Sequence, residues 1–155
     1  MPSAIDARLA ELGLELPLAA APVANYVPFV IEGRLLAISG QIPLTAEGPR
    51  YLGRLGDTLS LEEGQAAARL CGLNIIAQAR AALDGNLDRV RRIVRLGGFV
   101  AATADFTDHP KVINGASDLM VEVFGDAGRH SRAATGAASL PLGVGVEIDA
   151  LIAID

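Results

Sequence analysis

Apolar residues recur at helical spacing in two long segments of this chain. In residues 60–85 they recur every three or four positions, and Ser60 with two glutamates behind it is typical of a helix start. A second helix is expected over residues 108–125, with Asp108 as its N-cap, Pro110 in its first turn and a glycine at its end. Each helix has one apolar face, so each is expected to pack on a sheet.

Five strands are expected around these helices. Residues 27–31 and 34–39 form a hairpin pattern, and residues 92–101 form a strand whose central glycine pair indicates a bulge or a close backbone approach. The last quarter of the chain holds two more strands, separated by Leu140-Pro141, which we expect to form a terminal ribbon. The predicted order is two strands, a helix, a strand, a helix and two strands.

The N-terminal part of the chain does not follow this alternation. Ser3 marks the start of a short helix that Gly13 ends, and three prolines after it predict an extended, irregular arm. Residues 42–58 are rich in glycine and proline and predict a loop of a length that is often functional. One domain over residues 1–155 is expected, with residues 1–24 as its N-terminal helix and arm.

The two helices can cover only one face of the sheet, which predicts an α/β (α+β) fold in two layers. In the closing strand, polar residues alternate as far as Asp149, and residues 150–154 are apolar on both faces. A strand of that kind requires burial on both faces. A second copy of the chain is the simplest cover for the face without helices.

Composition narrows the classes of function. The net charge is -5 and the pI is about 5.0, with no basic stripe, so nucleic acid is not expected as the ligand. Cys71 is the single cysteine, an expected inert filler of the first long helix, and no His/Cys cluster has ligand spacing. We therefore expect no metal and a reducing compartment, the cytoplasm. No apolar run reaches about 18 residues, which argues against a membrane span.

Two charged residues stand in otherwise small or apolar strands of the last quarter. Arg132 begins one strand, and Glu147 lies between valine and isoleucine in the other. Charges are rarely placed in such strands unless something pairs with them, so both are candidates for chemistry. The alternatives are an ion pair of Arg132 between subunits and a solvated face for Glu147. His130, two residues before Arg132, is a further candidate for the same cleft.

Six short motifs occur along the chain in an order typical of one protein family. They are Asn25-Tyr26-Val27, the Ile-Ser-Gly-Gln-Ile-Pro segment at residues 38–43, Asn114, Arg132, Leu140-Pro141 and Val146-Glu147-Ile148. Together they resemble the Rid family, the YjgF-like reactive intermediate deaminases. The resemblance extends from about Tyr26 to the C-terminus and preserves the order of the elements.

The resemblance implies a chorismate-mutase-like fold with a mixed sheet, assembled as a homotrimer with clefts between neighbouring subunits. Deaminases of this family hydrolyse small imines and enamines, such as 2-aminoacrylate, 2-iminobutanoate and 2-iminopropanoate, to 2-keto acids and ammonia. They need no metal and no organic cofactor. The implied partners are a small carboxylate-bearing metabolite and further copies of the chain.

The resemblance also implies roles for the matching residues. Arg132 is expected to bind the substrate carboxylate, because a guanidinium offers a planar, two-pronged donor. Glu147 is expected to orient a water molecule or to move protons. The remaining residues expected to wall or polarise the cleft are Ser39 and Gly40 through their backbone N–H groups, Tyr26 of a neighbouring subunit, and Asn114.

Departures from the family pattern indicate a divergent branch. Ala134 stands where many deaminases of the family have a cysteine, which predicts a different pocket shape and leaves hydrolysis by water intact. The usual Gly-Pro-Tyr is Asn25-Tyr26 here, and the usual Pro-Ala before the arginine is His130-Ser131. The extra N-terminal segment, residues 1–24, also indicates a divergent branch.

Several interpretations stay open from the sequence alone. Tyr26 can be an apolar plug, Ser39-Gly40 a strand-ending turn, and Asn114 an exposed polar residue of its helix. A non-catalytic trimeric module that binds a metabolite or a protein through the same cleft is the alternative function. The ribonuclease name that some family members carry fits an acidic chain least well.

Overall fold

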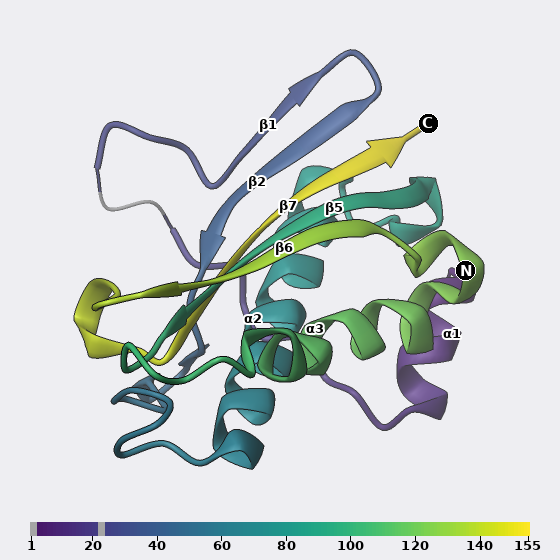
Figure 1. The fold of residues 1–155 in the computed structure, drawn as a ribbon. Coiled ribbons are helices and arrows are strands. Elements are labelled where there is room, and N and C mark those ends of the chain that lie inside the picture. Colours follow the sequence, from purple (N-terminus) through teal and green to yellow (C-terminus); the bar gives the residue numbers. More distant parts are fainter. Residues whose placement is uncertain (1–2, 22–23) are drawn as a thin grey trace.

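Five strands form one mixed sheet, and two long helices pack against one of its faces (Figure 1). The computed structural model describes residues 3–21 and 24–155. The strand order is β1-β2-β7-β5-β6, in which β5 and β6 run parallel because α3 crosses over between them. The bounds are β1 Phe29–Glu32, β2 Leu35–Gln41, β5 Val90–Ala101, β6 Ser131–Ala137, β7 Val146–Ile154, α2 Leu61–Ala82 and α3 His109–Phe124. The expected two-layer α+β fold and element order are confirmed.

Both long helices are present, but only one has the predicted cap. The hydroxyl of Ser60 accepts the N–H of Glu63 at 3.1 Å, and the Glu63 carboxylate accepts the N–H of Ser60 at the same distance. Asp108 precedes α3 as predicted, yet its side chain makes no capping hydrogen bond and instead pairs with Lys111 at 3.5 Å. Because Pro110 lies in the first turn, one N–H that a cap would satisfy is missing.

The register of β5 with its neighbours separates the sheet residues into two faces. Leu96 lies opposite Arg132 of β6 and opposite Ala150 of β7, and Leu96 and Ala150 are buried beneath the helices. Phe99, three residues further along β5, lies opposite Glu147 on the other face. Arg132 therefore faces the helices, whereas Glu147 faces away from them.

The glycine pair of β5 allows close packing. The register of β5 shifts near its start, between Val90 and Arg95, and not at the glycines, so the second of the two predicted alternatives applies. The predicted close approach is confirmed, because a Cβ atom at Gly98 would lie 2.7 Å from the side chain of Ile113. The absence of a side chain lets α3 pack directly on the middle of β5.

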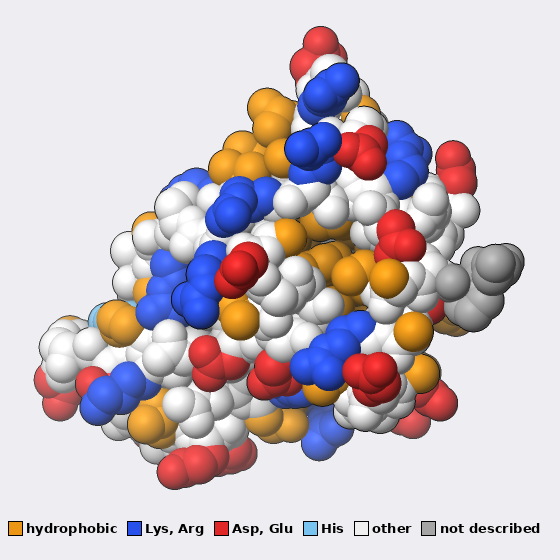
Figure 2. Space-filling view, turned by 90° about the vertical axis from the view of Figure 1, so that its right-hand side faces the viewer, with side chains coloured by type: hydrophobic (Ala, Val, Ile, Leu, Met, Phe, Trp, Pro, Cys, Tyr) orange, Lys and Arg blue, Asp and Glu red, His pale blue; other side chains and the backbone are white. Residues whose placement is uncertain are grey.

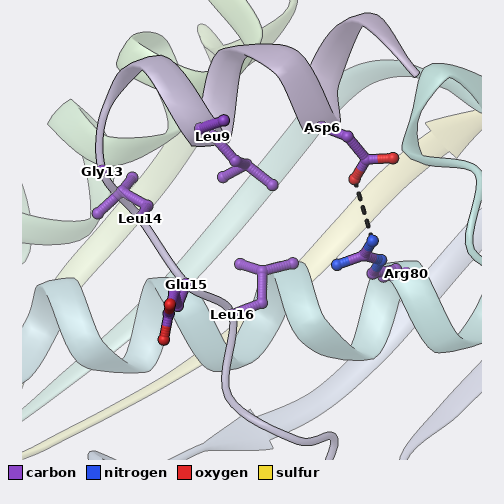
Figure 3. Close-up of a pocket in the computed structure, with 8 residues that line it drawn as sticks. Asp6, Leu9, Gly13, Leu14, Glu15, Leu16 and Arg80 are labelled. Carbon is purple, nitrogen blue, oxygen red and sulfur yellow. Dashed lines mark ion pairs between the residues drawn. The ribbon is translucent and has the colours of Figure 1, made fainter. Parts of the chain in front are cut away.

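The N-terminal helix α1 (Ala4–Glu11) begins after Ser3, as predicted, and Ser3 and Asp6 form a capping box there. The carboxylate of Asp88, in the turn before β5, accepts the first two backbone N–H groups of α1 at 2.9 and 3.0 Å. Figure 3 shows α1 lying over α2, where Asp6 pairs with Arg80 at 3.2 Å. The helix is thus tied to the domain at several points.

The arm that follows α1 runs across α2 without regular structure, as predicted. Gln78, buried in α2, donates Nε2 to the backbone oxygen of Ala20 at 3.0 Å. Asn74, one turn earlier, holds the segment after β2 in the same way, by donating to the carbonyl oxygens of Ile42 and Leu44. Pro22, one of the three prolines behind the prediction, lies outside the described residues.

Two expectations about connections are wrong. Residues 42–58 are more than a loop, since β3 (Leu44–Thr45) and β4 (Gly48–Pro49) pair as a small second sheet. The last two strands form no ribbon, because β5 lies between β6 and β7. A strand that follows a crossover helix pairs parallel with the strand before it, and that rule places β6 beside β5.

The sheet face away from α2 and α3 carries both apolar and charged side chains. Val30, Leu35 and Phe99 are exposed on it, and Asp149 pairs with Arg95 at 3.9 Å. Along β7, side chains toward the helices are buried and those on this face are half-buried, in alternation up to the end of the strand. We call this surface the helix-free face.

Charged side chains of both signs occur on the side of the molecule shown in Figure 2. The net charge of the chain is -5. Of the helices in residues 3–21 and 24–155, none combines the length and the apolarity that a bilayer span requires.

Candidate functional site

Four of the predicted site residues line one cavity of about 400 Å³ beside the end of β2. These residues are Tyr26, Ser39, Gly40 and Glu147. The size and the presence of one carboxylate suit a small molecule with a polar end. The rest of the wall is largely apolar and comprises Ala20, Ala21, Pro28, Ile42, Leu44, Pro141 and Leu142, with Gln41 and Gln78.

A bulge in β2 shapes this cavity. The register of β2 against β7 shifts between Ile38 and Gln41, so Ser39 and Gly40 together face one residue of β7, Asp149. A bulge takes backbone groups out of the regular ladder and re-aims the chain, which makes room for a ligand.

Ser39 contributes less to the cavity than predicted. Its N–H donates to the carbonyl oxygen of Pro28 at 3.0 Å, and its hydroxyl donates to the carbonyl oxygen of Val27 at 2.7 Å. Both donors are therefore used in anchoring the chain that leads into β1. The expectation that the N–H of Ser39 polarises the cleft does not fit this geometry, so Gly40 is the better candidate of the two.

Glu147 is half-buried in the cavity wall, in contact with the β2 bulge. Burial raises the pKa of the Glu147 carboxyl group, and the negative charge of the neighbouring Asp149 raises it further. A carboxyl group with a raised pKa exchanges its proton closer to neutral pH, which suits a general acid or base.

Arg132 is held by neutral groups of α3. Nη1 donates to Oδ1 of Asn114 at 2.8 Å and to Oγ of Ser117 at 2.9 Å, and Nη2 donates to the carbonyl oxygen of Pro110 at 3.2 Å. Among the ion pairs of the described residues, none involves Arg132. Three of its five N–H bonds are engaged, which leaves Nε–H and one N–H of Nη2 for a ligand.

Sequence reasoning missed Ser117. It lies three residues after Asn114 on α3, and residues at that spacing share a helix face, which is the signal that could have found it. Its Oγ lies 2.8 Å from Nε2 of His130, and Nδ1 of His130 lies 2.6 Å from the carbonyl oxygen of Gly128. His130 thus contacts a residue that holds Arg132 and does not line the 400 Å³ cavity.

The two groups of predicted residues do not meet within one subunit. Arg132 and Ala134 face the helices from the edge strand β6, and Ala134 packs against the core. Glu147 faces away from the helices on β7, with β5 between the two strands. A site that uses Arg132 and Glu147 together needs a second copy of the chain.

Cys71 and a second pocket are weaker candidates for a functional site. Cys71 is fully buried, and burial together with the charge of Glu147 raises the pKa of its thiol well above the ordinary value, as expected for an inert cysteine. A larger pocket of about 860 Å³ lies between α1 and α2 (Figure 3). Two of its charged residues, Asp6 and Arg80, already pair with each other there, so the cavity that contains Glu147 is the stronger candidate.

The fold and the two residue groups define a class of small α+β proteins with a mixed sheet and helices on one face. A family model described as "YjgF/chorismate_mutase-like, putative endoribonuclease" matches residues 6–150. The chain therefore belongs to the YjgF/chorismate-mutase-like family. The match begins twenty residues before Tyr26, so it includes most of α1 and the arm.

Relatives of known sequence or structure resemble the chain over nearly its whole length. Protein TCP17 of Trypanosoma cruzi is 49% identical over 152 residues, which cover 97% of this chain and 94% of TCP17. The crystal structure of Atu1372, a protein of unknown function from Agrobacterium tumefaciens, has a TM-score of 0.92 and 49% identity, covering 97% of this chain and 92% of that chain. E. coli TdcF with bound serine shares the fold, with a TM-score of 0.64, 23% identity and coverage of 91% and 97%.

Proposed function

We propose that this protein is an imine and enamine hydrolase that converts small 2-imino or 2-enamino acids to 2-keto acids and ammonia. The observation that carries the proposal is the state of Arg132, which is fixed by neutral acceptors and has no ion-pair partner among the described residues. The donors left over, Nε–H and one N–H of Nη2, are of the kind that binds the oxygens of a carboxylate. TdcF, a distant relative, is known with bound serine, which carries such a carboxylate.

Glu147 supplies the proton chemistry in this proposal. Hydrolysis adds the oxygen of water to the imine carbon, moves protons from that water to the nitrogen, and breaks the carbon–nitrogen bond as ammonia leaves. A carboxylate beside the cavity can accept the proton of the attacking water and return it to the nitrogen. The raised pKa of Glu147 supports this role, because it brings the two protonation states closer in free energy at neutral pH.

A neighbouring subunit completes the site, in a homotrimer. The helix-free face bears exposed apolar residues, among them Val30, Leu35 and Phe99, and a face of this kind is typical of an interface. A copy that covers this face can bring its own Arg132 and Asn114 toward the cavity of Glu147. The proposed location is the cytoplasm, where small metabolites with an imine group arise.

Ammonia release from freshly generated 2-aminoacrylate tests this function. We expect the wild type to accelerate release over buffer, and Arg132→Ala to abolish the acceleration because the substrate carboxylate loses its partner. Arg129→Ala is the matched control, since Arg129 is an exposed arginine nearby that pairs only with Asp126. No acceleration by the wild type contradicts the proposed activity on this substrate.

The same variants separate hydrolysis from binding without turnover. A 2-keto acid that raises the melting temperature of the wild type, but not of Arg132→Ala, shows that the site holds a carboxylate. If the wild type shows that shift but releases no ammonia from 2-aminoacrylate, the protein is a metabolite-binding module.

A further inference from the structure

We propose that Ser117 and His130 are positioning residues for Arg132, and that they set how tightly the site holds a carboxylate. This role rests on the proposed function of Arg132. It concerns two residues outside the motifs that match the family, one on α3 and one just before β6. Ser117 contacts the guanidinium of Arg132, and His130 contacts Ser117. Neither residue lines the 400 Å³ cavity.

When the His130 ring is neutral, hydrogen-bond chemistry sets the direction of each contact in this group. The carbonyl oxygen of Gly128 can only accept, so Nδ1 of His130, at 2.6 Å from it, carries the hydrogen. In the neutral ring Nε2 is then the acceptor, and the hydroxyl of Ser117 donates to it over 2.8 Å. The lone pairs of Ser117 Oγ are left to accept Nη1 of Arg132 at 2.9 Å.

Helix and strand geometry bring these side chains together. Asn114 and Ser117 lie almost one turn apart on the same face of α3, and both accept hydrogens of Nη1. His130 and Arg132 lie two residues apart in extended chain, so their side chains point the same way.

The consequence is a guanidinium whose orientation is set before a ligand arrives. Both hydrogens of Nη1 and one of Nη2 are engaged, which restricts rotation of the group and holds the remaining donors in fixed directions. An unrestrained arginine loses rotamer freedom when it binds, and that loss weakens binding. Here the freedom is already lost on folding. His130 acts on Arg132 indirectly, through Ser117. It accepts the hydroxyl hydrogen of Ser117, so that hydrogen points away from Arg132.

The test compares a charged ligand with a neutral analogue by isothermal titration of the whole protein. Pyruvate carries the carboxylate, and pyruvamide replaces it with an amide. We expect Ser117→Ala to bind pyruvate about tenfold more weakly, the effect of losing one hydrogen bond to a charged group. His130→Leu leaves the Ser117 hydroxyl without its acceptor and is expected to weaken pyruvate binding as well. Their loss of affinity for pyruvamide is expected to be smaller, because a neutral amide oxygen interacts less strongly with the guanidinium than a carboxylate does.

Conservative variants and matched controls sharpen the comparison. Ser117→Thr keeps the hydroxyl and His130→Gln keeps an acceptor, so both are expected to retain wild-type affinity for pyruvate. Ser131→Ala removes a hydroxyl that bonds only to the carbonyl oxygen of Val94, and it is expected to change nothing. If Ser117→Ala does not fold, the pair His130→Leu and His130→Gln tests the same contacts.

Unchanged affinity for pyruvate in both Ser117→Ala and His130→Leu overturns the positioning role and leaves the proposed function in place. Equal losses for pyruvate and pyruvamide also overturn it, because they indicate general damage to the fold. A wild type that neither binds pyruvate nor releases ammonia contradicts the proposed function itself.

Discussion

A Cβ atom at Gly40 would lie 2.6 Å from Oε1 of Glu147. The bulge of β2 and the carboxylate on β7 are therefore in direct contact across two neighbouring strands, beside the candidate cavity. Gly40 does not have the positive φ that favours glycine. Its side chain is absent here because of the space that Glu147 occupies.

Gly40→Ala is expected to displace the Glu147 carboxylate and to lower ammonia release from 2-aminoacrylate by about a hundredfold, the effect of a misplaced catalytic group. The fold is expected to persist, because alanine tolerates the backbone conformation at this position. Steady-state kinetics and thermal unfolding followed by circular dichroism check both points. Ser39→Ala, in the same bulge, removes only the hydroxyl bond to Val27 and is the control. Full activity in Gly40→Ala would contradict the role of Glu147.

Glu147→Gln is expected to stabilise the protein at neutral pH. The pKa of Glu147 is raised above 4.5, its ordinary value, so the folded state keeps the proton at pH values where the unfolded chain has lost it. Ionisation of Glu147 therefore costs stability as the pH rises through this window. Glutamine removes that cost, by less than about 1 kcal/mol because the side chain is half-exposed.

Urea unfolding at two pH values measures this effect. Near pH 7 the free energy of unfolding of Glu147→Gln is expected to exceed that of the wild type. Near pH 3, well below the ordinary pKa of 4.5, the carboxyl group is protonated in both states and the two proteins are expected to be equal. A difference that is the same at both pH values points to altered packing and not to ionisation.

Local sequence patterns predicted the helices well, because helix starts and ends depend on nearby residues. The capping box of Ser60 and Glu63 and the glycine after α3 can each be recognised from a few consecutive residues. Strand pairing depends on residues far apart in the chain. Nothing in residues 131–154 alone shows that β5 separates β6 from β7, and this is why the expected terminal ribbon was wrong.

Of the residues at the candidate site, the sequence predicted those that belong to family motifs. The family motifs found Arg132, Asn114, Gly40 and Glu147, but not which of them meet, since that depends on strand register. Ser117 belongs to no motif, and its role follows from a three-residue spacing on α3 and a contact with the distant β6. Side-chain contacts of this kind need three-dimensional packing.

Leu151→Lys is expected to dissociate the proposed homotrimer. Leu151 lies on the helix-free face between Ala37 and Arg95, so a lysine there places a second positive charge beside Arg95 where a neighbouring subunit would pack. Size-exclusion chromatography with light scattering is expected to give a trimer of the 16.0 kDa chain for the wild type and a monomer for the variant. Leu18→Lys, at a side chain that is 95% exposed, is the control. A monomeric wild type would contradict the shared site.

Gln78→Leu is expected to release the arm that closes the candidate cavity. The buried amide of Gln78 donates to the carbonyl oxygen of Ala20, and leucine leaves that oxygen without its partner, at a cost of about 1 to 2 kcal/mol. Ala20 and Ala21 line the cavity, so an arm that detaches also opens one wall. The KM for the imine is therefore expected to rise while the melting transition stays cooperative.

Gln65→Leu separates this effect from a general change in α2. Gln65 lies on the same helix and donates to the carbonyl oxygen of Lys111 at 3.1 Å, in an exposed contact away from the arm. Its loss is expected to change the free energy of unfolding by less than about 0.5 kcal/mol and to leave the KM unchanged. Urea unfolding and limited proteolysis of the arm measure both variants side by side. Equal protease resistance of the arm in Gln78→Leu and Gln65→Leu means that contacts of α1, such as Asp6 with Arg80, hold the arm in place without Gln78.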